Sequence, residues 1–332
     1  MAYGLSKLQK CQIGLETTPG TAIVATNVWR GMFKMSDKSV QQTAEERVGT
    51  FFPTERNFNA SKGGEVQWGP SEATFEQFPY VLEAGVKTVT TGVADTGGSG
   101  KVYTYTFPTT QANTTSTYTL EVGSNVRVDE MEYAYVSKFT LAGAAKEALK
   151  VTATWVGRQC TDAEFTTSLS LPTVEEVIFS KGKLYIDDTA ASIGVTAKTA
   201  TWLGLQMDVE TGINQLWTAD GISNVFGTTK NVGPKITGKL TLEHDATGVA
   251  EFGYARATTV RYVKFLWEGT ALTTAGSVYS KKSLIFTAGI VYDAVPDVGD
   301  QSGDEVIELA FHVCESTPVP TFVVVNQLTA LT

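Results

Sequence analysis

The chain has 332 residues, of which 42% are hydrophobic and 18% charged, and its net charge is −9. This length is typical of two domains, and the apolar content suits packed cores, which excludes an intrinsically disordered protein. The negative charge argues against a protein that grips nucleic acid through clustered Lys and Arg, although not against one that lets nucleic acid pass.

The first part of the chain predicts short strands around a polar insertion. Residues 28–35 alternate apolar and polar side chains, which indicates a strand. Residues 41–63 are polar and contain Gly and Pro, so we expect a long loop or an irregular hairpin arm. Val66 and Trp68 lie on one face of a further short strand.

A helix is predicted next. Ser71 could cap it, apolar residues recur with helical spacing, and Gly85 would end it. Pro79 lies inside this window and would remove one backbone hydrogen bond. Residues 88–100 follow as a Thr- and Gly-rich loop.

Strands then continue to the middle of the chain. Residues 102–107 and 117–122 have strand character, and residues 139–141 and 149–155 alternate as the arms of a half-buried antiparallel hairpin. Residues 160–180 are rich in Thr and Ser and predict a domain boundary.

The second part of the chain repeats the first at an offset of 174 residues. Residues 52–80 match 226–254, although identity is low and chance similarity is the alternative. A duplication predicts one domain over 1–165, a linker over 166–182 and a second domain over 183–332. The strands expected in the second copy are 183–187, 202–209, 236–243, 259–267, 282–292 and 305–314, with a helix at about 247–257.

The residues offer little for catalysis or for a metal. His244 and His312 have no further ligands at zinc spacing, so structural roles are expected. Residues 96–101 superficially resemble a phosphate-binding loop but lack its first Gly and its final Ser or Thr. The acidic loop 297–305 offers oxygen atoms to Ca²⁺ but matches no EF-hand spacing, and a solvated hairpin tip is the other interpretation. We therefore predict no enzyme, no cofactor and no metal.

The cysteines and the apolar runs bear on the compartment. The three cysteines are far apart and lack CxxC spacing, as expected for incidental thiols in a reducing compartment. The start of the chain has no apolar core of signal-peptide length, and the run 322–325 is too short to span a bilayer. We expect a soluble protein made without an export signal.

Most tryptophans lie in alternating strand patterns and are expected in the core, namely Trp29, Trp68, Trp155, Trp202 and Trp267. Trp217 lies in a polar stretch instead, so we expect it to face a partner.

Four places in the chain carry a resemblance to a known family. They are residues 13–22 running on to 29–31, residues 139–143 with 149–157, residues 208–212 followed by 220–221, and residues 239–244. Together they resemble the major tail tube proteins of long-tailed, siphovirus-like bacteriophages, of the type with a duplicated domain. The resemblance runs through most of the chain, although no single segment is a diagnostic motif.

This resemblance implies a mainly β protein with two tandem β-sandwich or partial-barrel tail-tube domains, each with one flanking α-helix. It also implies a virion protein, assembled in the host cytoplasm, whose rings stack into a hollow tail tube. DNA would pass through the lumen without specific binding, and no membrane would be involved. The implied partners are other copies in a trimeric ring with pseudo-sixfold symmetry, a tape measure protein and the tail-end proteins.

Assembly contacts are expected in the polar segments 41–63 and 215–237, which would reach an adjacent ring or subunit and order on assembly. The tail 318–332 could add a strand to a neighbour, or form the last strand of its own domain. A negatively charged lumen would let DNA slide. The candidate assembly residues are Arg47, Glu55, Arg56, Trp217, Lys230 and Phe322.

Alternative functions remain open from the sequence. A tail terminator, a connector or a baseplate hub would share the tube fold, and copy number per particle would separate them from a tube. A non-viral β-sandwich surface or binding protein is a further alternative, but a surface protein would normally need an export signal.

Overall fold

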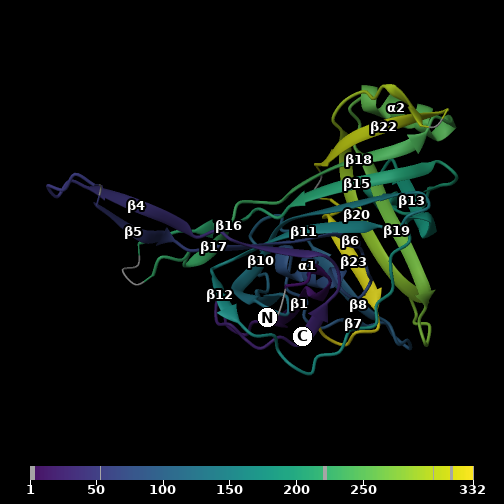
Figure 1. The fold of residues 1–332 in the computed structure, drawn as a ribbon. Coiled ribbons are helices and arrows are strands. Elements are labelled where there is room, and N and C mark those ends of the chain that lie inside the picture. The colour runs from purple at the N-terminus through teal and green to yellow at the C-terminus, as the bar shows by residue number, and fades with distance from the viewer. Residues whose placement is uncertain (1–3, 53, 220–222, 302, 315–316, 332) are drawn as a thin grey trace.

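The computed structural model describes residues 4–52, 54–219, 223–301, 303–314 and 317–331 (Figure 1). Pro53 of the predicted repeat, Asp220 and Gly221 of one segment that carries the resemblance, and Ser302 of the acidic loop lie outside these residues. The protein is mainly β, as the sequence predicts, and its strands pair antiparallel.

The first half contains one α-helix and strands of very different length. They are β1 (Lys10–Leu15), β2 (Asn27–Trp29), β3 (Phe33–Asp37), β4 (Val40–Glu46), β5 (Thr54–Ser61), β6 (Gly64–Glu72), α1 (Phe78–Gly85), β7 (Val93–Ala94), β8 (Lys101–Thr106), β9 (Tyr118–Gly123), β10 (Val128–Ala144), β11 (Lys150–Gly157) and β12 (Cys160–Ala163).

The second half likewise contains one α-helix and many strands. Its elements are β13 (Gly182–Asp187), β14 (Ala197–Lys198), β15 (Trp202–Glu210), β16 (Ile213–Leu216), β17 (Thr228–Asn231), β18 (Lys235–Glu243), α2 (Ala246–Arg256), β19 (Arg261–Ala271), β20 (Lys281–Tyr292), β21 (Val298–Gln301), β22 (Asp304–Val313) and β23 (Thr321–Asn326). Short 3-10 turns occur at Ser6–Leu8, Phe179–Lys181 and Ala190–Ser192.

One long sheet runs through both halves in the order β3-β6-β11-β10-β15-β18-β22-β21. Strand β10 also belongs to a second layer, in the order β2-β1-β9-β10-β12. Strand β20 pairs with β22 and belongs to a further run of strands, β14-β13-β19-β20-β23-β8-β7, in which β7 and β8 come from the first half. The sheets therefore curve around a shared core, but the described pairings leave β3 and β21 as the two ends of the long sheet.

Strand pairing shows which elements of the two halves correspond. Strand β1 begins at Lys10 and β13 at Gly182, which is 172 residues later. Phe33 lies opposite Trp68 in the β3–β6 pair, and Leu205 opposite Leu240 in the β15–β18 pair, again 172 residues later. The hairpins β4–β5 and β16–β17 keep the same offset in their pairing. The elements thus recur two residues closer than the offset of 174, while the limits predicted for the domains remain a prediction.

Most of the extra length of the first half is in residues 88–116, which contain β7 and β8. Strand β8 pairs with β23 from the end of the chain, so this insertion ties the two halves together. It is not the structureless loop that its composition indicates at 88–100, because β7 pairs with β8 there.

The two helices differ in role. Helix α1 begins at Phe78 and not near Ser71, because β6 continues to Glu72 and pairs with β11. Pro79 falls in the first turn, where the missing N–H costs no helical hydrogen bond. The predicted loss of a backbone hydrogen bond at Pro79 is therefore wrong. All residues of α1 are buried, whereas α2 lies on the outside of the fold (Figure 1). Asp245 caps α2 by accepting hydrogen bonds from the backbone N–H of Thr247 and Gly248.

Four of the five tryptophans expected in the core are buried there, at positions 29, 68, 155 and 267, each at most 4% exposed. Trp202 is only half-buried and stacks on Phe265 at 5.6 Å between ring centroids. The alternating pattern therefore placed these side chains on the correct face.

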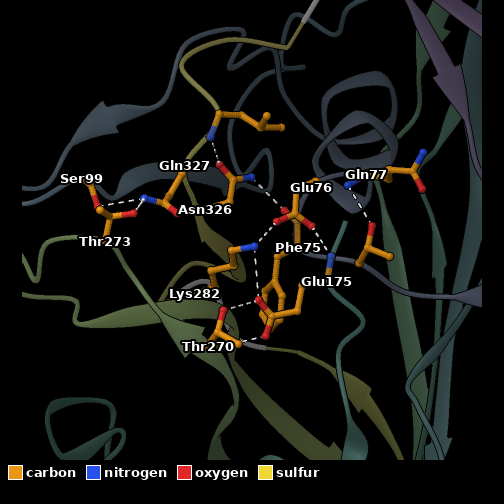
Figure 2. A network of polar contacts seen from close by, with 12 residues as sticks. Phe75, Glu76, Gln77, Ser99, Glu175, Thr270, Thr273, Lys282, Asn326 and Gln327 are labelled. Carbon is orange, nitrogen blue, oxygen red and sulfur yellow. Dashed lines mark hydrogen bonds and ion pairs between the residues drawn. The ribbon is translucent and has the colours of Figure 1, made fainter. Parts of the chain in front are cut away.

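A polar network joins the segment before α1, the segment 166–182 and the second half (Figure 2). Lys282 Nζ lies 2.6 Å from Glu76 Oε1 and 3.2 Å from Glu175 Oε2. The Glu175 carboxylate also accepts hydrogen bonds from the backbone N–H and the hydroxyl of Thr270, each at 2.6 Å. Asn326 donates to the carbonyl oxygen of Phe75 at 2.8 Å. These contacts join the two halves of the chain to each other.

Candidate functional site

The junction between the halves is a complete antiparallel strand pair. Lys138 lies opposite Glu210, Phe139 opposite Val209 and Leu141 opposite Met207. Phe139, Leu141, Met207 and Val209 are buried, and Thr140 donates a hydrogen bond to Asp208 at 2.6 Å on the other face. The edge of the first half is thus covered by the first long-sheet strand of the second half.

The same two edges are repeated, uncovered, at the ends of the long sheet. Strand β3 corresponds to β15 and pairs only with β6 among the described residues. Strand β22 lies between β18 and β21, as β11 lies between β6 and β10. Strand β21 therefore occupies the position of the second part of β10, and it is exposed along its whole length. The internal junction pairs a β10 edge with a β15 edge. At the ends of the long sheet, β21 presents an edge of the first kind and β3 an edge of the second kind.

One face of the long sheet is polar and mixed in charge. Lys239 and Glu308 form an ion pair at 2.9 Å, and Lys138 lies opposite Glu210. Lysines and carboxylates both occur on this face, so it is not of a single charge. Its side chains include those of Lys34, Glu65, Gln67, Lys138, Thr140, Thr152, Gln206, Asp208, Glu210, Lys235, Thr237, Lys239, Thr241 and Glu308.

The hairpin β4–β5 forms an arm that extends away from the body of the protein (Figure 1). The expected arm is therefore present as a regular ladder. Phe51 and Phe52 at its tip are 99% and 81% exposed. A two-stranded ribbon that is exposed on both faces is marginally stable in water.

Three of the predicted assembly residues lie on this arm. Arg47 is exposed near the tip, and Glu55 and Arg56 are exposed on β5. Arg56 pairs with Glu46 of β4, so this arginine already has a partner within the arm. The structure thus brings these three residues together, apart from the others.

The corresponding hairpin β16–β17 packs on its own chain. Phe226 is fully buried, with its ring centroid 5.0 Å from that of Tyr133, and the Arg158 guanidinium lies over both rings. Trp217 is 45% exposed and touches Phe226 edge-on, while Lys230 is exposed on β17. The described part of 215–237 is therefore held against the first half, which differs from a segment that waits for a neighbour to order it.

The assembly role expected for Phe322 is wrong for the folded chain. This side chain is fully buried and packs on Phe286 at 4.6 Å between ring centroids. Strand β23 lies between β20 and β8, so the described end of the chain forms a strand within its own fold and adds none to a neighbour.

The other candidates from the sequence have structural partners. His244 pairs with Glu305, and His312 with Asp293. Asp95 in the Gly-rich loop accepts hydrogen bonds from the backbone N–H of Val278 and Tyr279. Most of the acidic loop is strand, since residues 298–301 form β21 and pair with residues 304–307 of β22. Within the described residues, no group of three or more His, Cys, Asp or Glu side chains is arranged to hold a metal ion.

The sequence reasoning missed three buried ionisable residues, Arg261, Glu251 and Glu83. Arg261 is 2% exposed and forms an ion pair with the buried Glu251 at 2.8 Å. Glu83 on α1 is fully buried, and burial raises the pKa of its carboxyl group to about 7 despite a hydrogen bond from Ser116. A lone glutamate within the apolar stretch 78–85 was the available signal.

Comparison with known proteins leaves the family open, because no protein-family model and no curated protein matches the chain. In the part of the chain that the structure describes, neither helix is long and apolar enough to cross a membrane.

Proposed function

We propose that this chain is a structural virion protein whose copies form rings that stack into the tail tube of a siphovirus-like bacteriophage. In this proposal each half is one tail-tube domain of β-sandwich or partial-barrel type, with α1 or α2 as its helix. The observation that carries the proposal is the β10–β15 junction, because the chain already pairs the two kinds of edge that it leaves free at β3 and β21.

Such edges favour head-to-tail association. An interface between two different surfaces of the same chain generates a ring when the rotation closes and an open filament when it does not. Each chain contributes two corresponding units, so three chains would supply the six units of a pseudo-sixfold ring. Ring closure would also remove the exposed sheet edges, which otherwise invite aggregation.

The polar face of the long sheet would form the lumen. Its lysines and carboxylates neighbour each other, as Lys239 and Glu308 do. Neutralised lysines offer few free contacts to DNA phosphates, so DNA could pass without being held. A tape measure protein would occupy the same channel before the DNA, and tail-end proteins would close the tube.

The arm would connect one ring to the next. Its exposed Phe51 and Phe52 offer apolar surface at the far end of an extended hairpin. Burying two phenylalanine side chains contributes roughly 3–6 kcal/mol per arm, and each ring would contain several arms. Stacking would therefore be cooperative.

Negative-stain electron microscopy of the concentrated recombinant protein tests this proposal. Hollow tubes or rings with threefold or pseudo-sixfold symmetry are expected. Discrete monomers at every concentration would overturn self-assembly into a tube and favour a part that needs a partner, such as a terminator, connector or baseplate hub. Immunogold labelling of phage particles would then separate a repeated tube protein from a single terminal ring.

A further inference from the structure

We propose that the ring closes by addition of β21 from one subunit to β3 of the next, antiparallel, with Val298 opposite Met35. This inference rests on the proposed function, since it specifies the contact between copies. The segment 297–300 would pair with 33–36, and the contact would continue the long sheet from subunit to subunit.

The register follows from the junction inside the chain. In the first half, Leu141 of β10 pairs with Val151 of β11, and Ala153 of β11 pairs with Trp68 of β6. In the second half, Val298 of β21 pairs with Ile307 of β22, and Leu309 of β22 pairs with Leu240 of β18. Trp68 corresponds to Leu240, so their partners Ala153 and Leu309 also correspond. Val151 and Ile307 each lie two residues before these partners and therefore correspond to each other. Leu141 pairs with Val151 and Val298 pairs with Ile307, so Leu141 corresponds to Val298.

The other side of the contact is placed in the same way. Leu141 lies opposite Met207 in the internal junction. Met207 of β15 corresponds to Met35 of β3 at the offset of 172 set by the β3–β6 and β15–β18 pairs. A junction between subunits that repeats the internal one therefore places Val298 opposite Met35.

The side chains on these edges are compatible with that register. Val298 is 46% exposed, and Phe33 and Met35 are half-buried at the border of the core, so the pairing would cover apolar surface on the inner face. On the polar face Lys34 would lie diagonally across from Asp297, in reach of an ion pair. The internal junction has the same chemistry, with Lys138 opposite Glu210.

The contact between subunits would be shorter than the internal one. Pro296 precedes β21 and has no backbone N–H to donate, so the ladder would end there. The internal β10–β15 ladder has no such interruption across 138–144. The weaker contact would let subunits exchange until the third one closes the ring.

Cysteine cross-linking tests the register. The variant carries M35C and V298C, with the exposed Cys314 replaced by Ser, and is oxidised after tubes or rings have been confirmed by electron microscopy. We expect reducible covalent oligomers that stop at the trimer on a non-reducing denaturing gel. The matched control S36C/V298C places the two thiols on opposite faces of the sheet and should cross-link at least tenfold less.

Tubes that form without the Met35–Val298 cross-link, or that cross-link equally in the control, would overturn the register and leave the tube function standing. A protein that forms no rings or tubes, in wild type or variant, would overturn both. If only the cysteine variant fails to assemble, V298K decides. We expect it to stay folded but to assemble at least tenfold less, while V278K, at a 72% exposed valine away from both edges, assembles normally. Normal assembly of V298K would overturn the inference.

Discussion

Glu83 should make the stability of this protein fall as pH rises. Its side chain is fully buried in α1, one carboxylate oxygen accepts a hydrogen bond from Ser116 at 2.7 Å, and the other has no hydrogen-bond partner among the described residues. The hydroxyl groups of Tyr105 and Tyr118 are likewise buried without a described partner. This environment offers little to stabilise a negative charge, so the neutral acid is favoured.

The magnitude follows from the pKa. Burial raises the pKa of Glu83 from 4.5 to about 7. Between these pH values the Glu83 carboxyl group has lost its proton in the unfolded chain but retains it in the folded chain. The contribution of Glu83 to the free energy of unfolding therefore falls with rising pH and changes no further above about pH 7. A shift of this size corresponds to about 3 kcal/mol. Below pH 4.5 both states bind the proton and the penalty is absent.

The test compares E83Q with the wild type by denaturant unfolding at several pH values, at protein concentrations below assembly. Glutamine has nearly the same shape but does not ionise, so the difference in unfolding free energy between E83Q and wild type should increase by about 3 kcal/mol from pH 4 to pH 8. Any constant effect of the amide cancels in this comparison. The control E72Q, at an exposed position of β6, should show no such trend. Parallel profiles for E83Q and wild type would refute the reasoning.

The remaining predictions concern the arm and the last strand. Deletion of residues 44–60 should leave a folded protein, judged by circular dichroism and thermal unfolding, because both faces of the arm are exposed and the core does not depend on it. The same variant should form no tubes in the electron microscope, and normal tubes would contradict the prediction. F322A should lower the free energy of unfolding by about 3–5 kcal/mol, as expected for a fully buried phenylalanine. W217A, at a 45% exposed side chain, should lower it by less, and equal losses in denaturant unfolding would show that burial does not decide the difference.

The strands that alternate strictly could be predicted from the sequence. In β11, β15 and β18 one face is buried and the other polar, so the period of two is visible in the residues. The second helix was also predictable because its start coincides with Asp245, a good capping residue. Helix α1 was harder, since Ser71 looks like a cap but belongs to a strand that β11 extends.

Strand β23 illustrates a different limit. The run from Phe322 to Val325 is continuously apolar, which suits an exposed edge that waits for a neighbour as well as a strand between two others. Only its pairing with β8, more than two hundred residues earlier in the chain, decides between them. Long-range pairing of this kind leaves no local signal, and for the same reason the free edges at β3 and β21 could not be located from the sequence.

The offset between the halves shows why the assembly surface depends on strand register. Offsets of 174 and 172 are both even, so either one assigns every side chain to the same face of the sheet, and the hydrophobic pattern cannot separate them. They differ in the partner that they assign. An offset of 174 carries Met207 back to Phe33 and would place Val298 opposite that residue, whereas 172 carries it to Met35. A cross-link from Val298 to position 33 that exceeded the one to position 35 would therefore restore the larger offset, and the opposite result would establish that ladder register, more than sequence similarity, determines how the copies meet.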